Sequence, residues 1–259
     1  LAKKQENIED FKKGFIAILL PVLLITLLIL PANLSTAAMI FITCLVLMFV
    51  GRVRLRYILA LVGIGLVSMA LLIAIVINVP QLGKRVGTWQ SRIENFNSGD
   101  SDGNYQVEQA KIAIANGGFT GRMPGNSTQK NFLPHPYSDF IFAIIIEEYG
   151  LIGGTLVVLL YLVLLFRAIK IVIRSPRNFA AFLTFGVAFS LVFQAMINMM
   201  VAVNLMPVTG QTLPLISMGG TSIWFTSISI GIILSVSREV EEEIQKNDKQ
   251  PKQPEHAVV

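Results

Sequence analysis

The chain has little charge, a single cysteine and two histidines, and each shortage removes a class of protein or site. Charged residues make up 14% and hydrophobic residues 53% of its 259 residues, with a mean hydropathy of +0.65. Soluble domains carry about 25% charged residues, so this composition predicts an integral membrane protein. Cys44 alone cannot form a disulfide or a cysteine-based metal site within the chain. His135 and His256, in a central loop and in the tail, do not suggest a pair of metal ligands.

Nucleotide-binding signatures are also absent from the sequence. It contains no GxxxxGK[ST] phosphate-binding motif and no Rossmann fingerprint. The net charge of +5 comes from basic residues that flank apolar runs, a distribution that reflects membrane topology. No nucleic-acid partner is therefore expected.

Six apolar runs predict an all-α, polytopic membrane helix bundle. The runs cover residues 14–30, 35–50, 57–79, 140–166, 179–203 and 216–236. The first two are at the short end for a transmembrane helix, which needs about 17–25 residues. Residues 1–13 form a predicted cytoplasmic segment and residues 14–238 the membrane domain. The charged tail, residues 239–259, is expected to extend the last helix briefly and then to be disordered.

The basic residues predict which side of the membrane each loop faces. With the N-terminus inside, 15 of the 21 Lys and Arg residues are cytoplasmic, and the other six all lie in the polar loop 81–138. The positive-inside rule therefore places both ends of this chain in the cytoplasm and that loop outside. Within the loop, residues 107–115 have the spacing of a short helix.

Asp139 lies where this loop enters the fourth apolar run, directly before Phe140. A carboxylate is costly at the mouth of a membrane helix, which favours a functional role. The alternative is a helix N-cap, because Asp accepts backbone N–H bonds there. An enzyme with its site outside the membrane must use a substrate that already carries its activation. A carboxylate in such a site is a candidate general base.

Three stretches resemble the bacterial SEDS family of division, elongation and sporulation proteins. Residues 125–150 read GNSTQKNFLPHPYSDFIFAIIIEEYG, similar to the family pattern G-N-S-x-Q-K, L-P, H-T-D-F-I-F-A and E-E-x-G. Residues 194–222 resemble its N-x-x-V, P-x-T-G, L-P and S-x-G-G-[ST]-S signature. Residues 31–41, PANLSTAAMIF, match its Q-P-D-x-G-T block more weakly. Asn33 replaces an acidic residue in that block, which argues against a catalytic role for the turn.

The resemblance implies a peptidoglycan glycosyltransferase that polymerises lipid II outside the bacterial cytoplasmic membrane. Lipid II is a disaccharide peptide linked to undecaprenyl pyrophosphate. The sugar 4-hydroxyl of one molecule attacks C1 of the muramyl sugar of another, with inversion, and undecaprenyl pyrophosphate leaves. Asp139 matches the family's essential aspartate, in the role of general base. Family members have ten helices, so the six runs would be the last six, and the start at Leu1 is expected to be a truncation.

The resemblance also implies substrate contacts around this carboxylate. Lys130 and Arg122 are candidates for contacting the diphosphate, because the leaving group carries negative charge. The alternative is that both are loop charges exposed to solvent. A divalent cation, Mg²⁺ or Mn²⁺, could serve the same purpose, and no metal ligand is assigned to the chain. The other expected contacts are Gln129, His135 and Ser138, with a loop hydrogen bond as the alternative for His135.

Further polar residues are expected within the bundle. Glu147 and Glu148 indicate a polar cavity, or else one pairs with a cation and one caps a neighbouring helix. Ser217 and Thr221 open the last helix and favour close helix packing over ligand contact. Gln194, Asn198 and Asn204 are predicted to lie on one helix and to form hydrogen bonds inside the bundle. Turn geometry alone is expected to explain four glycines of the loop: Gly117, Gly118, Gly121 and Gly125.

The partners implied by the resemblance are a class B penicillin-binding protein, whose transmembrane helix packs on the bundle, and other divisome membrane proteins. The division-type member of the family is favoured over the elongation type. Two other functions compete with the polymerase. One is a lipid II flippase, which requires a central hydrophilic cavity and alternating access. The other is a non-catalytic divisome scaffold for a transpeptidase, which would tolerate loss of Asp139.

Overall fold

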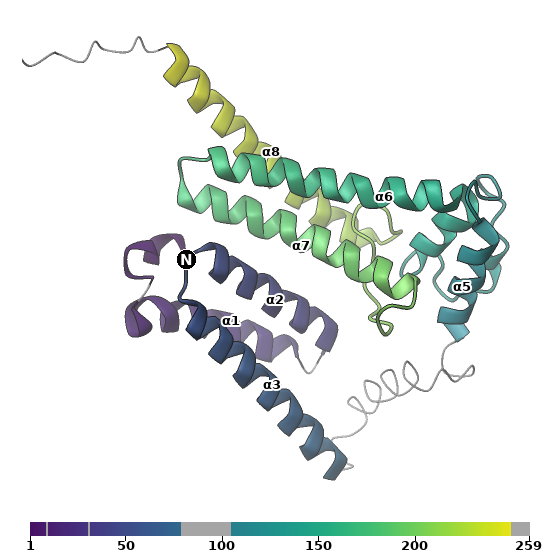
Figure 1. The fold of residues 1–259 in the computed structure, drawn as a ribbon, viewed down its shortest axis with the longest axis horizontal. Coiled ribbons are helices and arrows are strands. Elements are labelled where there is room, and N and C mark those ends of the chain that lie inside the picture. The colour runs from purple at the N-terminus through teal and green to yellow at the C-terminus, as the bar shows by residue number, and fades with distance from the viewer. Residues whose placement is uncertain (9, 31, 79–104, 250–259) are drawn as a thin grey trace, which may run out of the picture.

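The computed structural model describes residues 1–8, 10–30, 32–78 and 105–249 (Figure 1). These residues form helices and loops, with no strand among them, so the all-α prediction is confirmed. The helices are α1 (Ile16–Ile29), α2 (Leu34–Val50), α3 (Leu55–Asn78), α5 (Tyr105–Gly117), α6 (Ile141–Arg174), α7 (Asn178–Ala202) and α8 (Gly220–Lys249). Three short turns accompany them: η1 (Ala2–Asn7), η2 (Phe11–Phe15) and η4 (Gln129–Asn131).

Helix lengths support a multi-pass membrane protein. Four helices are long and apolar enough to cross a membrane: Phe11–Ile29, Ile141–Arg174, Asn178–Ala202 and Gly220–Lys246. α2 and the stretch Leu55–Gly65 of α3 are apolar but shorter, within the part of the chain that the structure describes. Each predicted run therefore contains a helix, while the count of six spans stays a prediction.

The last predicted run has different ends in the structure. α8 begins at Gly220, so residues 216–219 belong to the preceding loop, and it continues to Lys249. Arg177, in the link between α6 and α7, pairs with Glu239 and Glu243 on this extension. The helical extension therefore covers residues 239–249 of the predicted tail. The rest of the tail, residues 250–259, lies outside the described residues.

The other boundary differences concern α5 and α6. The short helix predicted over residues 107–115 is confirmed as α5. α6 runs through Arg174, beyond its predicted end at residue 166, so basic residues of the predicted cytoplasmic link lie on the helix itself. Residues 81–104 of the predicted outer loop, together with residues 79 and 80 before it, lie outside the described residues.

α6 and α7 form an antiparallel pair against which α2, α5 and α8 pack (Figure 1). Phe142 and Ile146 of α6 contact Ala195 and Met199 of α7 in the main apolar cluster, which Leu213 closes. A second cluster joins α5 to the start of α6 and includes Ala110, Leu133 and Phe140. α5 covers one end of α6, α2 packs against α7, and α1 packs against α2 (Figure 1).

α6 is broken at Gly150, where the backbone has φ 70° and ψ −171°. A break of this kind leaves carbonyls before it and amides after it without helical partners. Segment 118–123 takes up both kinds of group. The amides of Arg122 and Met123 donate to the carbonyls of Glu147 and Glu148, both at 3.0 Å. In return, the Leu151 amide donates to the carbonyl of residue 118 at 2.9 Å.

Three glycines permit this close approach of two backbones. A Cβ atom at Gly117 would lie 2.0 Å from the Ile146 carbonyl oxygen, and one at Gly121 would lie 2.2 Å from that of Glu148. A Cβ at Gly150 would lie 2.2 Å from the Phe119 carbonyl oxygen. The interpretation of Gly117 and Gly121 by turn geometry alone is therefore wrong, because space against α6 also requires them.

We predict that Gly150→Ala destabilises the protein. The φ and ψ of Gly150 belong to a region that is nearly exclusive to glycine and costs other residues about 1–3 kcal/mol, before the clash with Phe119 is counted. The midpoint of thermal unfolding in detergent should fall. Gly231→Ala is the matched control, because Gly231 lies in α8 with open space around its Cβ position. Equal midpoints for the two variants would contradict the account of the break.

Candidate functional site

Asp139 lies in the turn directly before α6, with its side chain partly buried. Phe140 holds the N-cap position, and no side chain caps the helix there. One carboxylate oxygen of Asp139 accepts a hydrogen bond from the Ser138 hydroxyl at 2.8 Å. The other faces Gly210, whose Cβ position would lie 3.8 Å away. The N-cap alternative for Asp139 is therefore wrong, and the carboxylate forms no ion pair among the described residues.

Hydrogen bonds donated to three consecutive carbonyls hold the backbone of residues 137–139, which we call the Asp139 corner. The Met218 amide donates to the carbonyl of residue 137 at 2.8 Å. The Ser217 hydroxyl donates to that of Ser138 at 2.6 Å, and the Asn198 side-chain amide donates to that of Asp139 at 2.8 Å. The corner is therefore fixed through its main-chain carbonyls. The Asp139 carboxylate, which accepts the Ser138 hydroxyl, can still interact with a ligand.

Asn198 connects the Asp139 corner to the segment that faces it. Its side chain, 1% exposed, also donates to the Gln211 carbonyl at 2.7 Å. Gln194, one turn earlier on α7, donates to the Thr212 carbonyl at 3.0 Å. The predicted hydrogen bonding of these two residues inside the bundle is confirmed. The prediction that places Asn204 on the same helix is wrong, because α7 ends at Ala202.

Ser217 is the buried member of the small-residue block before α8. Besides donating to the corner, its hydroxyl accepts the Leu213 amide at 2.7 Å. Thr221 is exposed in the first turn of α8. Ser217 thus lies in the loop before α8 and binds the loop before α6. The sequence predicted instead that it packs against a neighbouring helix.

Glu147 is fully buried and receives four hydrogen bonds from the loop that precedes η4. One carboxylate oxygen accepts the amide and the hydroxyl of Thr128, at 3.2 and 2.8 Å. The other accepts the Gln129 amide at 3.2 Å and the Ser127 hydroxyl. Glu147 therefore caps η4, as in the capping alternative, and no cation among the described residues pairs with it. Glu148 is partly buried next to it.

Both basic residues near the site contact their own loop. The Lys130 ammonium donates to the Gly125 carbonyl at 2.7 Å, and the Arg122 guanidinium donates to the Thr128 hydroxyl at 3.3 Å. Both contacts are exposed. Neither side chain hydrogen-bonds or ion-pairs with the Asp139 carboxylate, so the structure keeps the positive groups and the carboxylate apart.

The remaining predicted contact residues have different surroundings. Gln129 is buried, and its side-chain carbonyl oxygen has no hydrogen-bond partner. His135 is exposed, with φ 55°, and its backbone carbonyl accepts the Ser138 amide at 3.1 Å. Of the predicted substrate-contacting side chains, Ser138 alone hydrogen-bonds to the Asp139 carboxylate.

Sequence reasoning missed three residues that build this site. Ser127 and Thr128 bind Glu147, and Gly150 breaks α6. The signal for Gly150 was a glycine inside an apolar run, which marks a weak point in a helix. Ser127 and Thr128 directly precede η4, where hydroxyl residues commonly serve as caps. Their partner lies about twenty positions away along the chain, so local pattern alone could not identify it.

Comparison with known proteins gives a consistent result. The profile of the FtsW/RodA/SpoVE family, described as "Cell cycle protein", matches residues 1–242. "Stage V sporulation protein E" of Bacillus subtilis (strain 168) is 38% identical over 241 residues, which cover 92% of this chain and 64% of the relative. "Probable peptidoglycan glycosyltransferase FtsW" of Coxiella burnetii (strain RSA 493 / Nine Mile phase I) is 35% identical over 246 residues, covering 93% and 64%. The chain thus spans less than two thirds of the length of these relatives.

A solved structure is also similar to this chain. It was described under the heading "Structural coordination of polymerization and crosslinking by a peptidoglycan synthase complex". The two chains share 26% sequence identity with a TM-score of 0.68, and the match covers 92% of this chain and 66% of the other.

We predict that Glu147→Gln loosens the loop before η4. Each oxygen of Glu147 accepts one backbone amide, from Thr128 or Gln129, so the amide nitrogen of Gln would face an N–H in either orientation. One backbone amide then loses its acceptor, at a cost of about 1–3 kcal/mol. Hydrogen exchange at residues 128 and 129 should accelerate by about tenfold or more. Glu148→Gln is the control and should leave exchange there unchanged; equal protection in both variants would contradict the capping role.

We also predict that Asn198→Leu destabilises the protein. The substitution keeps the approximate volume but leaves the partly buried carbonyls of Asp139 and Gln211 without this donor, at up to about 1–3 kcal/mol for each group. Thr184→Val is the control on the same helix, because the buried Thr184 hydroxyl has no hydrogen-bond partner. Thermal unfolding in detergent should show a clear loss for the first variant and little change for the second. If Asn198→Leu and the unsubstituted protein unfolded at the same temperature, the role of Asn198 in joining α7 to the Asp139 corner would be contradicted.

Proposed function

Because the chain belongs to the FtsW/RodA/SpoVE family of cell cycle proteins, we propose that it is the membrane-embedded part of a peptidoglycan glycosyltransferase. The reaction is polymerisation of lipid II into glycan strands on the outer face of the bacterial cytoplasmic membrane. One observation carries the proposal. The Asp139 carboxylate is presented at the end of α6 with a single hydroxyl as its hydrogen-bond partner and no ion pair among the described residues.

Asp139 acts as the general base in this proposal. Its carboxylate takes the proton of the sugar 4-hydroxyl while the hydroxyl oxygen forms a bond to C1 of the muramyl sugar of a second lipid II. The bond between C1 and the diphosphate oxygen breaks, the electron pair leaves with undecaprenyl pyrophosphate, and C1 inverts. A carboxylate bound to a cation would be a poorer proton acceptor, so the free state of Asp139 supports this role.

Lys130 and Arg122 are the proposed contacts for the leaving diphosphate. Each holds one exposed hydrogen bond to a neutral oxygen of its own loop. A phosphate oxygen is a stronger acceptor for these charged donors, so either side chain can exchange its loop contact for the substrate. His135 and Ser138, beside Asp139 in the chain, are proposed to contact the sugars. Gln129 is a further proposed contact, and its buried side-chain oxygen would have to become exposed before it could meet the substrate.

A divalent cation, Mg²⁺ or Mn²⁺, would enter this proposal with the substrate. Among the described residues, no three His, Cys, Asp or Glu side chains come together as a resident metal site would require. The diphosphate oxygens would therefore supply the ligands together with water, and Asp139 would stay free to act as the base. Its chemical contribution would be to neutralise charge on the leaving group.

The proposed partners are a class B penicillin-binding protein and other divisome membrane proteins. The similar solved structure belongs to a complex that coordinates polymerisation with crosslinking, which supports a transpeptidase partner. The relatives named FtsW support a role in cell division, and the Bacillus subtilis relative is named for sporulation. Both ends of the chain would be cytoplasmic and the Asp139 corner outside, in agreement with the positions of the basic residues.

We predict that Asp139→Asn abolishes glycan-strand formation. The full chain is reconstituted with its penicillin-binding partner in proteoliposomes, supplied with lipid II, and the products are separated by gel electrophoresis. The amide keeps the size of the side chain and its hydrogen bond to Ser138 but cannot take the proton. Loss of a general base lowers rates by about 10²–10⁴-fold.

Glu148→Gln is the control for this experiment, because it also replaces a carboxylate by an amide, on the helix that follows Asp139. It should polymerise lipid II at the unsubstituted rate, and both variants should still bind lipid II and the partner. Unchanged polymerisation by Asp139→Asn would overturn the role of Asp139 as base. If the unsubstituted complex made no polymer but moved lipid II between leaflets, the flippase would replace this proposal. Partner binding without either activity would favour the scaffold.

A further inference from the structure

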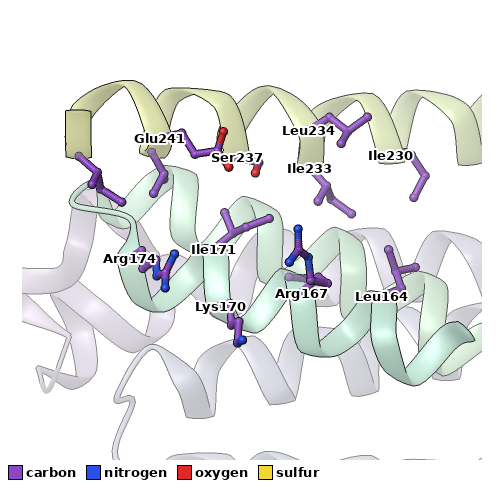
Figure 2. Close-up of a pocket in the computed structure, with 13 residues that line it drawn as sticks. Leu164, Arg167, Lys170, Ile171, Arg174, Ile230, Ile233, Leu234, Ser237 and Glu241 are labelled. Carbon is purple, nitrogen blue, oxygen red and sulfur yellow. The ribbon is translucent and has the colours of Figure 1, made fainter. Parts of the chain in front are cut away.

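A groove of about 250 Å³ lies between α6 and α8, at the opposite end of α6 from Asp139 (Figure 2). Its floor is formed by Ala168 and Ile233, which are buried together in a small apolar cluster. The basic residues at this end of α6 otherwise indicate only membrane topology. We call this feature the α6–α8 groove.

The two ends of the α6–α8 groove differ in chemistry. Leu164 and Ile230 line the end farther from the C-termini of the two helices. Arg174, the last residue of α6, and Glu241 of α8 line the end nearer those C-termini, and Ser237 lies between the two ends (Figure 2). A ligand that fills the groove would therefore need an apolar part that points into the bundle and a polar part at its end.

Four charged residues line the groove, and Arg167 and Arg174 are the two arginines among them. They are seven residues apart, two turns of helix, so they share one face of α6, with a rise of about 10 Å between them. Figure 2 shows the guanidinium of Arg167 directed toward α8, whereas the ammonium of Lys170 points away. Lys170 instead lies over the Phe166 ring, 4.5 Å from its centroid.

The two groove arginines have no anionic partner among the described residues. Glu241 lines the same groove but forms no ion pair with either of them. Two arginines just outside the groove differ in this respect. Arg177 pairs with Glu239 and Glu243, and Arg238 pairs with Glu242. Acidic side chains of α8 therefore neutralise the outer arginines and leave the groove arginines available.

We propose that the α6–α8 groove binds an anionic phospholipid of the leaflet on this side of the membrane. The phosphate contacts Arg167 and Arg174, with the Ser237 hydroxyl as a further donor, and an acyl chain lies along Leu164 and Ile230. Arginine suits this role because its guanidinium can donate two parallel hydrogen bonds to phosphate oxygens. Basic pockets between transmembrane helices on the cytoplasmic side, where anionic lipids are concentrated, bind such head groups.

Size and depth support this occupant. The groove is smaller than the roughly 300–1,000 Å³ of pockets that enclose drug-sized ligands, so it would hold the phosphate and the adjoining carbons while the rest of the lipid stays in the bilayer. A charged side chain one or two turns inside a membrane helix is costly unless it reaches the interface or a counter-ion. A lipid phosphate provides that counter-ion for Arg167.

The test is native mass spectrometry of the full chain released from nanodiscs that contain equal amounts of phosphatidylglycerol and phosphatidylcholine. The unsubstituted protein should retain phosphatidylglycerol in preference. The double variant Arg167→Gln/Arg174→Gln should lose about tenfold or more of this retention. The double variant Arg177→Gln/Arg238→Gln removes the same charge from the same end of the protein outside the groove, and it should retain the lipid.

Three results would overturn the proposal. The first is equal retention of the two lipids by the unsubstituted protein, which needs no variant and is independent of folding. The second is unchanged retention in Arg167→Gln/Arg174→Gln, which would leave the groove to another occupant such as an acidic protein segment. The third is an equal loss in both double variants, which would indicate attraction by bulk charge. The lipid site does not depend on the proposed glycosyltransferase activity.

Discussion

The buried carboxylate of Glu147 is the contact on which the candidate site depends. It gathers two backbone amides and two hydroxyls from residues 127–129 at the point where the loop passes α6. Glu147 lies about 12 Å along the helix from Asp139 by helical rise. Segment 127–139 is therefore bound at one end by the side of α6 and at the other by Asn198, Ser217 and Met218. This loop segment is therefore fixed at both ends.

The break at Gly150 reinforces this arrangement, because the groups it exposes on α6 bind segment 118–123. Loop and helix thus exchange main-chain hydrogen bonds on both sides of Gly150. The result is a rigid frame around a carboxylate whose own hydrogen bonding is nearly unused. Such a frame suits a catalytic group, which must be held in place without being neutralised by its surroundings.

The sequence predicted the membrane helices, α5 and the position of Asp139, because apolar periodicity and a polar residue at a helix mouth are local signals. It did not predict the broken α6, since the free energy that permits the break comes from a loop about thirty residues earlier. For the same reason, the sequence predicted that Glu147 lies inside the helix bundle but not that it binds residues 127–129. Gly117 and Gly121 resembled ordinary turn glycines, and their contact with α6 emerged only from the packing. Long-range contacts account for each of these misses.

The most direct test of the central claim is a structure of the chain and its partner with lipid II bound as the acceptor. The account predicts that a carboxylate oxygen of Asp139 lies within hydrogen-bond reach, about 2.6–3.2 Å, of the sugar 4-hydroxyl. It also predicts that the contacts of Glu147 with residues 127–129 and of Asn198 with the Asp139 corner are unchanged by binding. A sugar bound elsewhere, with Asp139 pointing away from the hydroxyl, would contradict the claim that this frame exists to present the base.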